Sequence, residues 1–395
     1  MIRTGLVGGT FDPIHRGHTA LIKAALDSDR LDRVIVMPAG RPPHKEQQRV
    51  LPASYRLAMT EKAFSGLDGI TVSNLEISQK RRSYTIDTIR RLRPYLPDSS
   101  ELVLVYGSDI LLDLEHWYHP EEILNECPLL LARRGGYDAV EAERLAAMFR
   151  QRYGARIEFF DCPQIDLSSS EIRQAISSGR PWKANVPKAV AALIEKHGLY
   201  RYESEWMDVP GDVWQMMLDI EQQLIPLLSR GRLLHSLNVA LYALHLARCH
   251  GLDERQTLTA GLLHDSAKCL QPRRQAELAA RAGDPNLLTE DLMHAPAGSV
   301  LAREQFGIED PQVLKAILCH TTGCPRMSPL DQIIYLADKI EPSRPFDDLE
   351  PLRRMAEVDL PAAMHLCLQE IEAALKRDGQ PLHPYSKALL YTSEA

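Results

Sequence analysis

A glycine turn near the start of the chain constrains its fold most. The apolar residues 5–7 lead directly into Gly8 and Gly9, and a segment ending at His18 follows, so the order is strand, turn and helix. Two glycines let backbone N–H groups approach a phosphate closely, and the N-terminus of a following helix favours an anion. His15 and His18 are three residues apart, which places both on one face of a helix. This segment therefore predicts a polyphosphate site in an α/β domain.

The length of the chain favours two domains, because 395 residues exceed the usual size of one hydrophobic core. The seven cysteines are scattered and form no C-x-x-C pair, which is typical of reduced thiols rather than of a disulfide framework. No apolar stretch reaches transmembrane length, and the glycine turn comes too early for a signal peptide. We therefore expect a cytoplasmic protein with no membrane contact.

Charge is distributed unevenly between the two halves. Residues 1–200 carry 27 basic and 25 acidic side chains, which leaves 19 and 28 for the remainder out of the chain totals of 46 and 53. An acidic second half argues against binding nucleic acid by phosphate neutralisation. The acidic half can still bind a small polyphosphate if metal ions supply positive charge.

The first half alternates between two kinds of segment. Short apolar runs predict strands at residues 34–37, 101–106 and 129–132, and the segments between them predict helices at residues 56–64, 86–93 and 137–150. This alternation predicts a Rossmann-like, doubly wound parallel sheet whose ligand site lies at the carboxyl ends of the strands. We expect this domain to span residues 1–200 and a polar linker to span 201–211.

Strand signals are missing from residue 212 onward. Five segments there fit a helical period: residues 233–249, 254–263, 290–306, 311–318 and 330–340. Residues 212–395 are therefore expected to form an all-α domain.

Two motifs of the first half resemble the nucleotidyltransferase superfamily. The sequence His15-Arg16-Gly17-His18 resembles its T/H-x-G-H signature, and residues 167–173, Leu-Ser-Ser-Ser-Glu-Ile-Arg, resemble its I-S-S-T-x-I-R motif. The resemblance implies an ATP site. The residues it implies for ATP binding are Gly8, Gly9, Thr10, Phe11, His15, His18, Gly107, Asp109, Ser169, Ser170 and Arg173.

Shorter elements point to the acceptor of the transfer reaction. Residues 83–88, Ser-Tyr-Thr-Ile-Asp-Thr, resemble an element of bacterial nicotinate-nucleotide adenylyltransferases, and Trp117 is placed like a tryptophan that stacks on the nicotinate ring. Taken singly, Thr85 is equally consistent with a helix cap and Trp117 with an ordinary packed aromatic. Pantetheine phosphate, choline phosphate and glycerol phosphate are the alternative acceptors within the superfamily. The implied nicotinate-nucleotide residues are His44, Lys45, Tyr84, Thr85 and Trp117.

Adenylyl transfer requires no strong general base, because the nucleophile is an anionic phosphate oxygen. The enzyme must align that oxygen with the α-phosphorus of ATP and stabilise the charge of the transition state. We expect His15, His18 and Arg173 to be the catalytic residues, with Mg²⁺ accompanying ATP. The implied reaction joins nicotinate mononucleotide to ATP and releases pyrophosphate.

The helical half contains histidines and aspartates in the order H…HD…H…H…D. These are His235, His264, Asp265, His294, His320 and Asp338. Imidazoles and carboxylates without a cysteine suit a pair of iron or manganese ions better than a structural zinc. We therefore predict a site for two transition-metal ions.

The segments around these residues resemble the HD phosphohydrolase superfamily, and in particular the bacterial HD family that cleaves diadenosine tetraphosphate symmetrically. The resemblance covers residues 230–345, and Asp265 would be the bridging ligand. Lys268, one turn beyond His264, can hold a phosphate oxygen, so Asp265 and Lys268 are the catalytic candidates. Two alternatives remain open: action on another nucleotide, and a non-catalytic nucleotide sensor or dimerisation module. A homo-oligomer is compatible with either.

Overall fold

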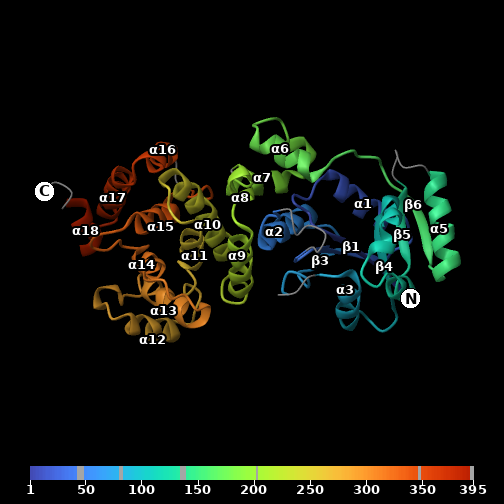
Figure 1. The fold of residues 1–395 in the computed structure, drawn as a ribbon, viewed down its shortest axis with the longest axis horizontal. Coiled ribbons are helices and arrows are strands. Elements are labelled where there is room, and N and C mark those ends of the chain that lie inside the picture. The colour runs from blue at the N-terminus through green and yellow to red at the C-terminus, as the bar shows by residue number, and fades with distance from the viewer. Residues whose placement is uncertain (42–48, 80–82, 134–138, 202, 346–347, 392–395) are drawn as a thin grey trace. The chain divides into compact units, whose positions relative to one another are not determined.

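The computed structural model describes residues 1–41, 49–79, 83–133, 139–201, 203–345 and 348–391. The chain forms two compact units, Met1–Glu195 and Lys196–Ala395. In Figure 1 the unit that contains the strands runs from blue to green, and the all-helical unit continues to red. Among the described residues, no helix is both long enough and apolar enough to cross a membrane.

A six-stranded sheet organises the first unit. Its spatial order is β3-β2-β1-β4-β5-β6, and every neighbouring pair is parallel. The strands are β1 (Ile2–Gly9), β2 (Arg33–Pro38), β3 (Ile70–Val72), β4 (Ser100–Gly107), β5 (Leu129–Arg133) and β6 (Ile157–Asp161). The strands predicted at residues 34–37, 101–106 and 129–132 are confirmed, as is the doubly wound class.

Helices connect these strands, and two more follow the last strand. They are α1 (Arg16–Asp27), α2 (Ala53–Phe64), α3 (Thr85–Leu92), α4 (Pro120–Glu126), α5 (Ala139–Tyr153), α6 (Ser169–Ser177) and α7 (Lys188–His197). Helix α6 begins where Ser168 accepts a hydrogen bond from the backbone of Glu171, whose side chain in turn accepts one from Ser168 N–H. This reciprocal cap fixes the N-terminus of a helix that carries an entire predicted motif.

The core of this unit lies between the sheet and its helices. Leu6, Leu104 and Leu131, from three neighbouring strands, are buried in one apolar cluster with Ile89 of α3 and Phe149 of α5. Strand order reverses between β1 and β4, so their carboxyl ends border the crevice in which sheets of this type bind ligands. The glycine turn follows β1 and therefore lies at that crevice.

In the second unit, every described element of regular secondary structure is a helix. Its helices are α8 (Glu203–Met207), α9 (Gly211–Leu224), α10 (Arg230–His250), α11 (Glu254–Leu263), α12 (Pro272–Ala282), α13 (His294–Phe306), α14 (Pro311–Cys319), α15 (Pro329–Ile340), α16 (Glu350–Val358), α17 (Leu360–Arg377) and α18 (Pro384–Tyr391). The predicted all-α class is confirmed. One predicted helix, 290–306, begins only at His294, because residues 289–293 form turns.

Close packing of α10 against α11 brings the first two histidine segments together. A side chain at Gly261 would place its Cβ 2.7 Å from Cα of Ala240, so only glycine permits this approach. His235 lies five residues before Ala240 on α10, and His264 follows the end of α11.

The segment expected as a linker, residues 201–211, is not an exposed linker, because some of its apolar side chains are buried. It contains α8, and the ring of Trp206 is buried and stacks on Trp214 of α9 at a centroid distance of 5.4 Å. Val209 is also buried. These contacts place the segment within the second unit, because a tryptophan and a valine supply enough apolar surface to dock an otherwise polar run.

Candidate active sites

The loop after β1 carries the two histidines of the first motif. His15 is the N-cap of α1 and His18 its third residue, and their rings stack with centroids 3.7 Å apart. The backbone N–H of His15 donates to Nδ1 of His18 at 3.3 Å. The rings of His18 and Phe11 also form a T-shaped pair, with centroids 5.1 Å apart. The imidazoles are therefore a packed pair at a helix N-terminus, where an anion is favoured.

A buried arginine holds the carboxyl ends of β1 and β2. Arg56 of α2 is 2% exposed. It donates to the carbonyl oxygens of Thr10 (2.9 Å), Ala39 (2.6 Å), Gly40 (3.0 Å) and Leu51 (2.9 Å). Sequence reasoning missed Arg56, since a lone arginine within a helical period gives no sign of burial. It fixes the backbone on which the glycine turn depends.

Helix α6 brings the second predicted motif against the first. The Ser169 hydroxyl donates to the carbonyl of Pro13 at 3.0 Å, and Nη1 of Arg173 donates to that of Asp12 at 2.8 Å. Nη2 of Arg173 contacts Oγ of Ser170 at 3.3 Å. Two motifs separated by about 150 residues therefore form one cluster at the β1–α1 loop.

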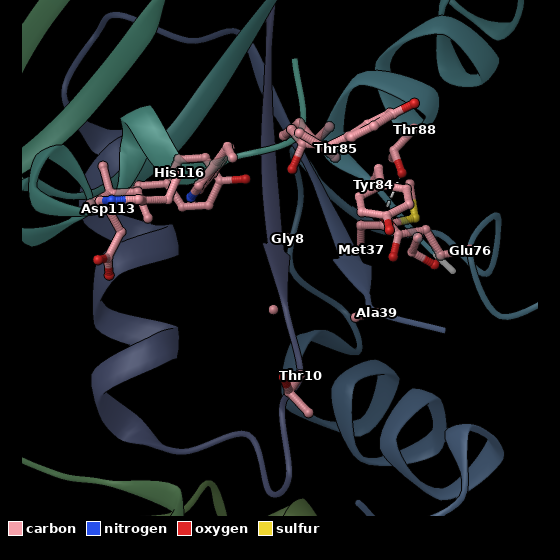
Figure 2. A pocket seen from close by; sticks show the side chains of 17 residues that line it. Gly8, Thr10, Met37, Ala39, Glu76, Tyr84, Thr85, Thr88, Asp113 and His116 are labelled. Carbon is pink, nitrogen blue, oxygen red and sulfur yellow. Dashed lines mark hydrogen bonds between the residues drawn. The ribbon is translucent and has the colours of Figure 1, made fainter. Parts of the chain in front are cut away.

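A pocket of about 480 Å³ opens at the carboxyl edge of the sheet (Figure 2). Of the predicted residues, Gly8, Gly9, Thr10, Tyr84, Thr85 and Trp117 line it. Figure 2 shows Tyr84 and Thr85 on one side of β1, and Asp113 and His116 on the other. The predicted phosphate turn and three of the five predicted nicotinate residues therefore share one cavity.

Several pocket residues were not predicted from the sequence, among them Glu76, Tyr106, Asp113 and His116, whereas Thr88 is the last residue of the predicted element 83–88. Thr88 donates from Oγ1 to Oε1 of Glu76 at 2.6 Å. Burial raises the pKa of Glu76, although the hydrogen bond from Thr88 opposes that shift. Glu76 is a single acidic residue between Leu75 and Ile77, and nothing in this local sequence marks it as a site residue. His116, by contrast, is adjacent to the predicted Trp117.

Other predicted residues lie outside that pocket. Phe11, His15, His18, Ser169, Ser170 and Arg173 belong to the loop cluster described above and do not line the cavity. Gly107 ends β4 and caps the short 3₁₀ helix Ser108–Leu112, in which Asp109 is exposed. His44 and Lys45 lie outside the described residues.

The second unit brings the six predicted metal ligands together, and Asp265 lies near the four histidines. Its two carboxylate oxygens face different partners. Oδ2 lies 3.6 Å from Nε2 of His264 and 3.9 Å from Nε2 of His235, whereas Oδ1 lies 3.5 Å from Nε2 of His294 and 3.6 Å from Nε2 of His320. Asp338 completes the first group, with Oδ1 2.9 Å from Nε2 of His235 and 3.7 Å from Nε2 of His264.

Backbone and carboxylate acceptors orient three of these imidazoles. Nδ1 of His264 lies 2.7 Å from the Gly261 carbonyl, and Nδ1 of His320 lies 2.7 Å from the Ile317 carbonyl. Nδ1 of His235 lies 3.1 Å from Oε1 of the fully buried Glu341. Carbonyl contacts of this kind assign the proton to Nδ1, so Nε2 keeps its lone pair toward the cluster.

The electrostatics of the cluster match a cation site. Burial lowers the pKa of His264 to about 4 and that of His294 to about 3, so both imidazoles are neutral at physiological pH. Burial alone would raise the pKa of Asp265, but His264 and His320 lower it well below its usual range. Neutral nitrogens and ionised carboxylates are the protonation states that metal ligands require. His235 is the exception, because burial alone would lower its pKa but two contacting carboxylates raise it.

An unsatisfied nitrogen supports the same conclusion. Nε2 of His264 is fully buried and has no hydrogen-bond partner among the described residues. Buried polar atoms are rarely left without a hydrogen-bond partner. This nitrogen lies between the carboxylates of Asp265 and Asp338. The second unit thus presents residues that fit a divalent metal.

Four cationic side chains flank the ligands. Only Lys268 was predicted, and its Nζ lies 3.1 Å from Nδ1 of His294. Nη1 of Arg232 donates to Oδ2 of Asp265 at 2.6 Å, Lys339 lies 3.0 Å from Oδ2 of Asp338, and Arg344 pairs with Oδ1 of Asp338. The spacing of Arg232, one turn before His235, is the signal that could have found it.

One cysteine expectation is corrected. Cys319 and Cys324 form a disulfide, although the scattered cysteines predicted only free thiols. Helix α14 ends at Cys319, and a turn with Gly323 in the left-handed region (φ 69°) returns the chain to it. The pairing depends on this reversal, which a five-residue separation does not reveal.

Comparison with known proteins fits the division into two units. A cytidylyltransferase-like family model matches residues 6–175, and an HD domain model matches residues 232–343. The fold and the two sites thus define a nucleotidyltransferase domain joined to an HD domain. A probable nicotinate-nucleotide adenylyltransferase of Thermoanaerobacter sp. is 34% identical over 204 residues, which are 52% of this chain and 97% of that protein. The chain belongs to the nicotinate-nucleotide adenylyltransferase family.

A relative of Mycoplasma pneumoniae aligns across both units. It is 29% identical over 377 residues, which are 94% of this chain and 99% of that protein, and it is named a probable nicotinate-nucleotide adenylyltransferase/Ap4A hydrolase. A crystal structure of a predicted HD superfamily hydrolase involved in NAD metabolism, from Clostridium acetobutylicum, is 34% identical. It covers 45% of this chain and 97% of its own length, with a TM-score of 0.43.

Proposed function

We propose that the chain is a bifunctional enzyme. Its first unit transfers AMP from ATP to nicotinate mononucleotide, and its second hydrolyses diadenosine tetraphosphate to two molecules of ADP. The observation that supports this proposal is that each unit has its own group of predicted residues. The first has a pocket that joins the glycine turn to Tyr84, Thr85 and Trp117, and the second has a carboxylate, Asp265, shared between two histidine groups.

In the transferase, the nicotinate ring binds in the pocket that Tyr84 and Trp117 line. A phosphate oxygen of the mononucleotide forms a bond to the α-phosphorus of ATP while the bond to the β-phosphate breaks, and pyrophosphate leaves. His15 and His18 contact the phosphates at the α1 N-terminus, and Ser170 and Arg173 hold the leaving group. Mg²⁺ bound with ATP would neutralise part of the phosphate charge.

Positioning accounts for most of this catalysis. Arg56, Ser169 and Arg173 bind the carbonyls of the loop after β1, so that the loop is ordered before substrates arrive. Preorganised donors act without the reorganisation that water would require. No residue of the pocket needs to remove a proton, because the attacking phosphate oxygen is already ionised.

In the hydrolase, His235, His264, Asp265 and Asp338 would hold one metal ion, and His294 and His320 would hold a second one together with Asp265. Two divalent ions there would activate water and clamp the attacked phosphate; iron or manganese suits the ligands. Lys268 binds a phosphate oxygen. Water adds to one of the central phosphorus atoms, and the bond between the two central phosphates breaks.

One experiment on the full-length chain tests both activities. Nicotinate mononucleotide and ATP should yield nicotinate adenine dinucleotide and pyrophosphate. Diadenosine tetraphosphate should yield ADP alone, whereas a mixture of ATP and AMP would contradict symmetric cleavage. An acceptor panel with nicotinamide mononucleotide and pantetheine phosphate tests the choice of nicotinate, and equal kcat/KM values for the two pyridine nucleotides would remove it. A chain that releases no product from any nucleotide would contradict the hydrolase.

A further inference from the structure

Two arginines at the edge of the HD cluster are not accounted for by metal ligation. Arg232 lies on α10, and Arg344 lies in the segment after α15. Each contacts a different carboxylate: Arg232 contacts Asp265 and Arg344 contacts Asp338. Arginine is the residue best suited to binding a phosphate with two parallel hydrogen bonds.

Exposure separates these arginines from the ligands. The side chains of Asp265 and Asp338 are 4% and 13% exposed, whereas those of Arg232 and Arg344 are 32% and 27% exposed. The guanidinium groups therefore lie between the buried ligands and solvent. A substrate that approaches the ligands from this side meets them first.

Both guanidinium groups keep donors for a ligand. Among the described residues, Arg232 uses only Nη1 to reach a side-chain acceptor. Arg344 uses Nε and Nη2, on the carbonyl and Oδ1 of Asp338, so its Nη1 remains. Lys339 differs, because its ammonium is occupied by the His320 carbonyl at 2.6 Å and by the Tyr335 ring.

The cations lie at two ends of the ligand cluster. Arg344 reaches Nε2 of His235 at 3.3 Å, and Arg232 shares Asp265 Oδ2 with the same histidine. Lys268 lies at the opposite group, beside His294. Three carboxylates of this site, those of Asp265, Asp338 and Glu341, face four cationic side chains even before metal ions are counted. Such a charge balance favours a polyanion that extends from one group to the other.

We propose that Arg232 and Arg344 bind phosphate oxygens of the substrate and, with Lys268 at the other end, select a chain of two or more phosphates. This inference rests on the proposed hydrolase function and adds the residues that determine its substrate class. The arginines bind outer phosphates, while the ligand cluster faces the bond that is cleaved.

The test is a calorimetric titration of ADP into the Mn²⁺-loaded full-length chain. Nicotinate adenine dinucleotide is present throughout to occupy the transferase site, and the binding component that disappears in Asp265→Ala is assigned to the HD site. Arg232→Met and Arg344→Met should each weaken this component by roughly 10-fold to 100-fold, the range for losing a charged hydrogen bond. Their manganese content should equal that of the wild type.

Matched variants separate phosphate binding from a structural role. Arg232→Lys should bind ADP more tightly than Arg232→Met but less tightly than the wild type. Lysine keeps the positive charge but lacks the two parallel N–H donors of the guanidinium group. Arg281→Met, which removes an arginine paired with Glu304 on the surface, should leave ADP affinity unchanged. AMP binding should suffer less than ADP binding, because a single phosphate cannot span the cluster.

Three results would overturn the proposal: unchanged ADP affinity in both methionine variants, loss of manganese from them, or no Asp265-dependent ADP binding in the wild type. Cleavage of diadenosine tetraphosphate is measured on the same preparations. A wild-type chain that binds ADP through these arginines but does not cleave that substrate would refute the proposed substrate and leave the phosphate-binding role intact.

Discussion

The two sites are built in opposite ways. In the transferase, side chains position the backbone: Arg56, Ser169 and Arg173 all donate to carbonyls of the loops that follow strands. In the HD unit, the backbone positions side chains, as the carbonyls of Gly261 and Ile317 orient His264 and His320. The first site therefore depends on the path of the chain, and the second on individual donor atoms.

This contrast predicts how each site responds to substitution. Removing a ligand from the HD unit should abolish one activity and leave the fold intact. Removing a support from the transferase should affect stability and activity together. The following variants test the contrast in order of decreasing expected effect.

Asp265→Ala should have the largest effect. Without the carboxylate shared by both histidine groups, two cations lose the charge that holds them close together, so metal should be lost and hydrolysis should fall by about 10³-fold or more. Dinucleotide synthesis should be unchanged, as no transferase motif residue lies beyond Arg173. Metal analysis and both assays on one preparation check this, with the surface variant Asp212→Ala as control. Joint loss of both activities in a folded protein would contradict independent sites.

His18→Ala should lower adenylyl transfer by about 10²-fold to 10³-fold, the usual effect of removing one stabilising donor. Diadenosine tetraphosphate cleavage and the Tm should be retained. Thr19→Ala, on the same helix, serves as control. Near-wild-type kcat in the His18 variant would remove this residue from the mechanism.

Arg56→Met should destabilise the first unit by about 3 kcal/mol or more, because four carbonyls, two of them in buried hydrogen bonds, lose their donor. Urea denaturation of the full-length chain measures this, with Arg144→Met, which removes a surface pair with Glu141, as the matched control. Arg56→Lys should fall in between. A stable Arg56→Met variant with normal adenylyl transfer would show that the loops after β1 and β2 keep their conformation without Arg56.

Glu341→Gln should weaken metal binding by about 10-fold, a typical effect of changing a group that orients a ligand. Glu341 contacts Nδ1 of His235, and burial alone would raise the pKa of Glu341, although its hydrogen bonds with His235 and Ser343 lower it. Metal affinity is measured by competition with a chelator. Unchanged affinity would mean that His235 needs no orienting partner.

Glu76→Gln should have the smallest effect, a slight stabilisation that depends on pH. Burial raises the pKa of Glu76 above its unfolded value of 4.5, so the folded state holds this proton more tightly. Stability is therefore lost as the pH rises from the unfolded pKa through the folded pKa. The variant should match the wild type in Tm at pH 4 and exceed it at pH 8. A variant whose Tm exceeds that of the wild type at pH 4 but not at pH 8 would contradict a raised pKa for Glu76.

The sequence predicted the HD cluster well and the transferase pocket only in part. His235, His264 and Asp338 lie on or beside helices whose period follows from apolar spacing, so their convergence could be expected. Arg56 and Glu76 could not be found in this way. Their burial depends on which loops meet at the carboxyl edge of the sheet, and neither residue belongs to a motif with a characteristic spacing.

Tertiary contacts also decided two local outcomes. The Trp206 segment read as a linker because its polar residues outnumber its apolar ones, yet one indole stacking on Trp214 docks it. Similarly, the disulfide between Cys319 and Cys324 depends on the turn at Gly323 rather than on sequence separation.

The division of Asp265 between two histidine groups has a thermodynamic consequence. Oδ1 and Oδ2 belong to one carboxylate, so a cation that binds at either oxygen withdraws charge from the other. The two positions are therefore linked, and by reciprocity each ion changes the affinity for its neighbour by the same factor. Metal titrations of the intact chain should depart from the curve of two independent sites, and Asp265 determines the size of that departure.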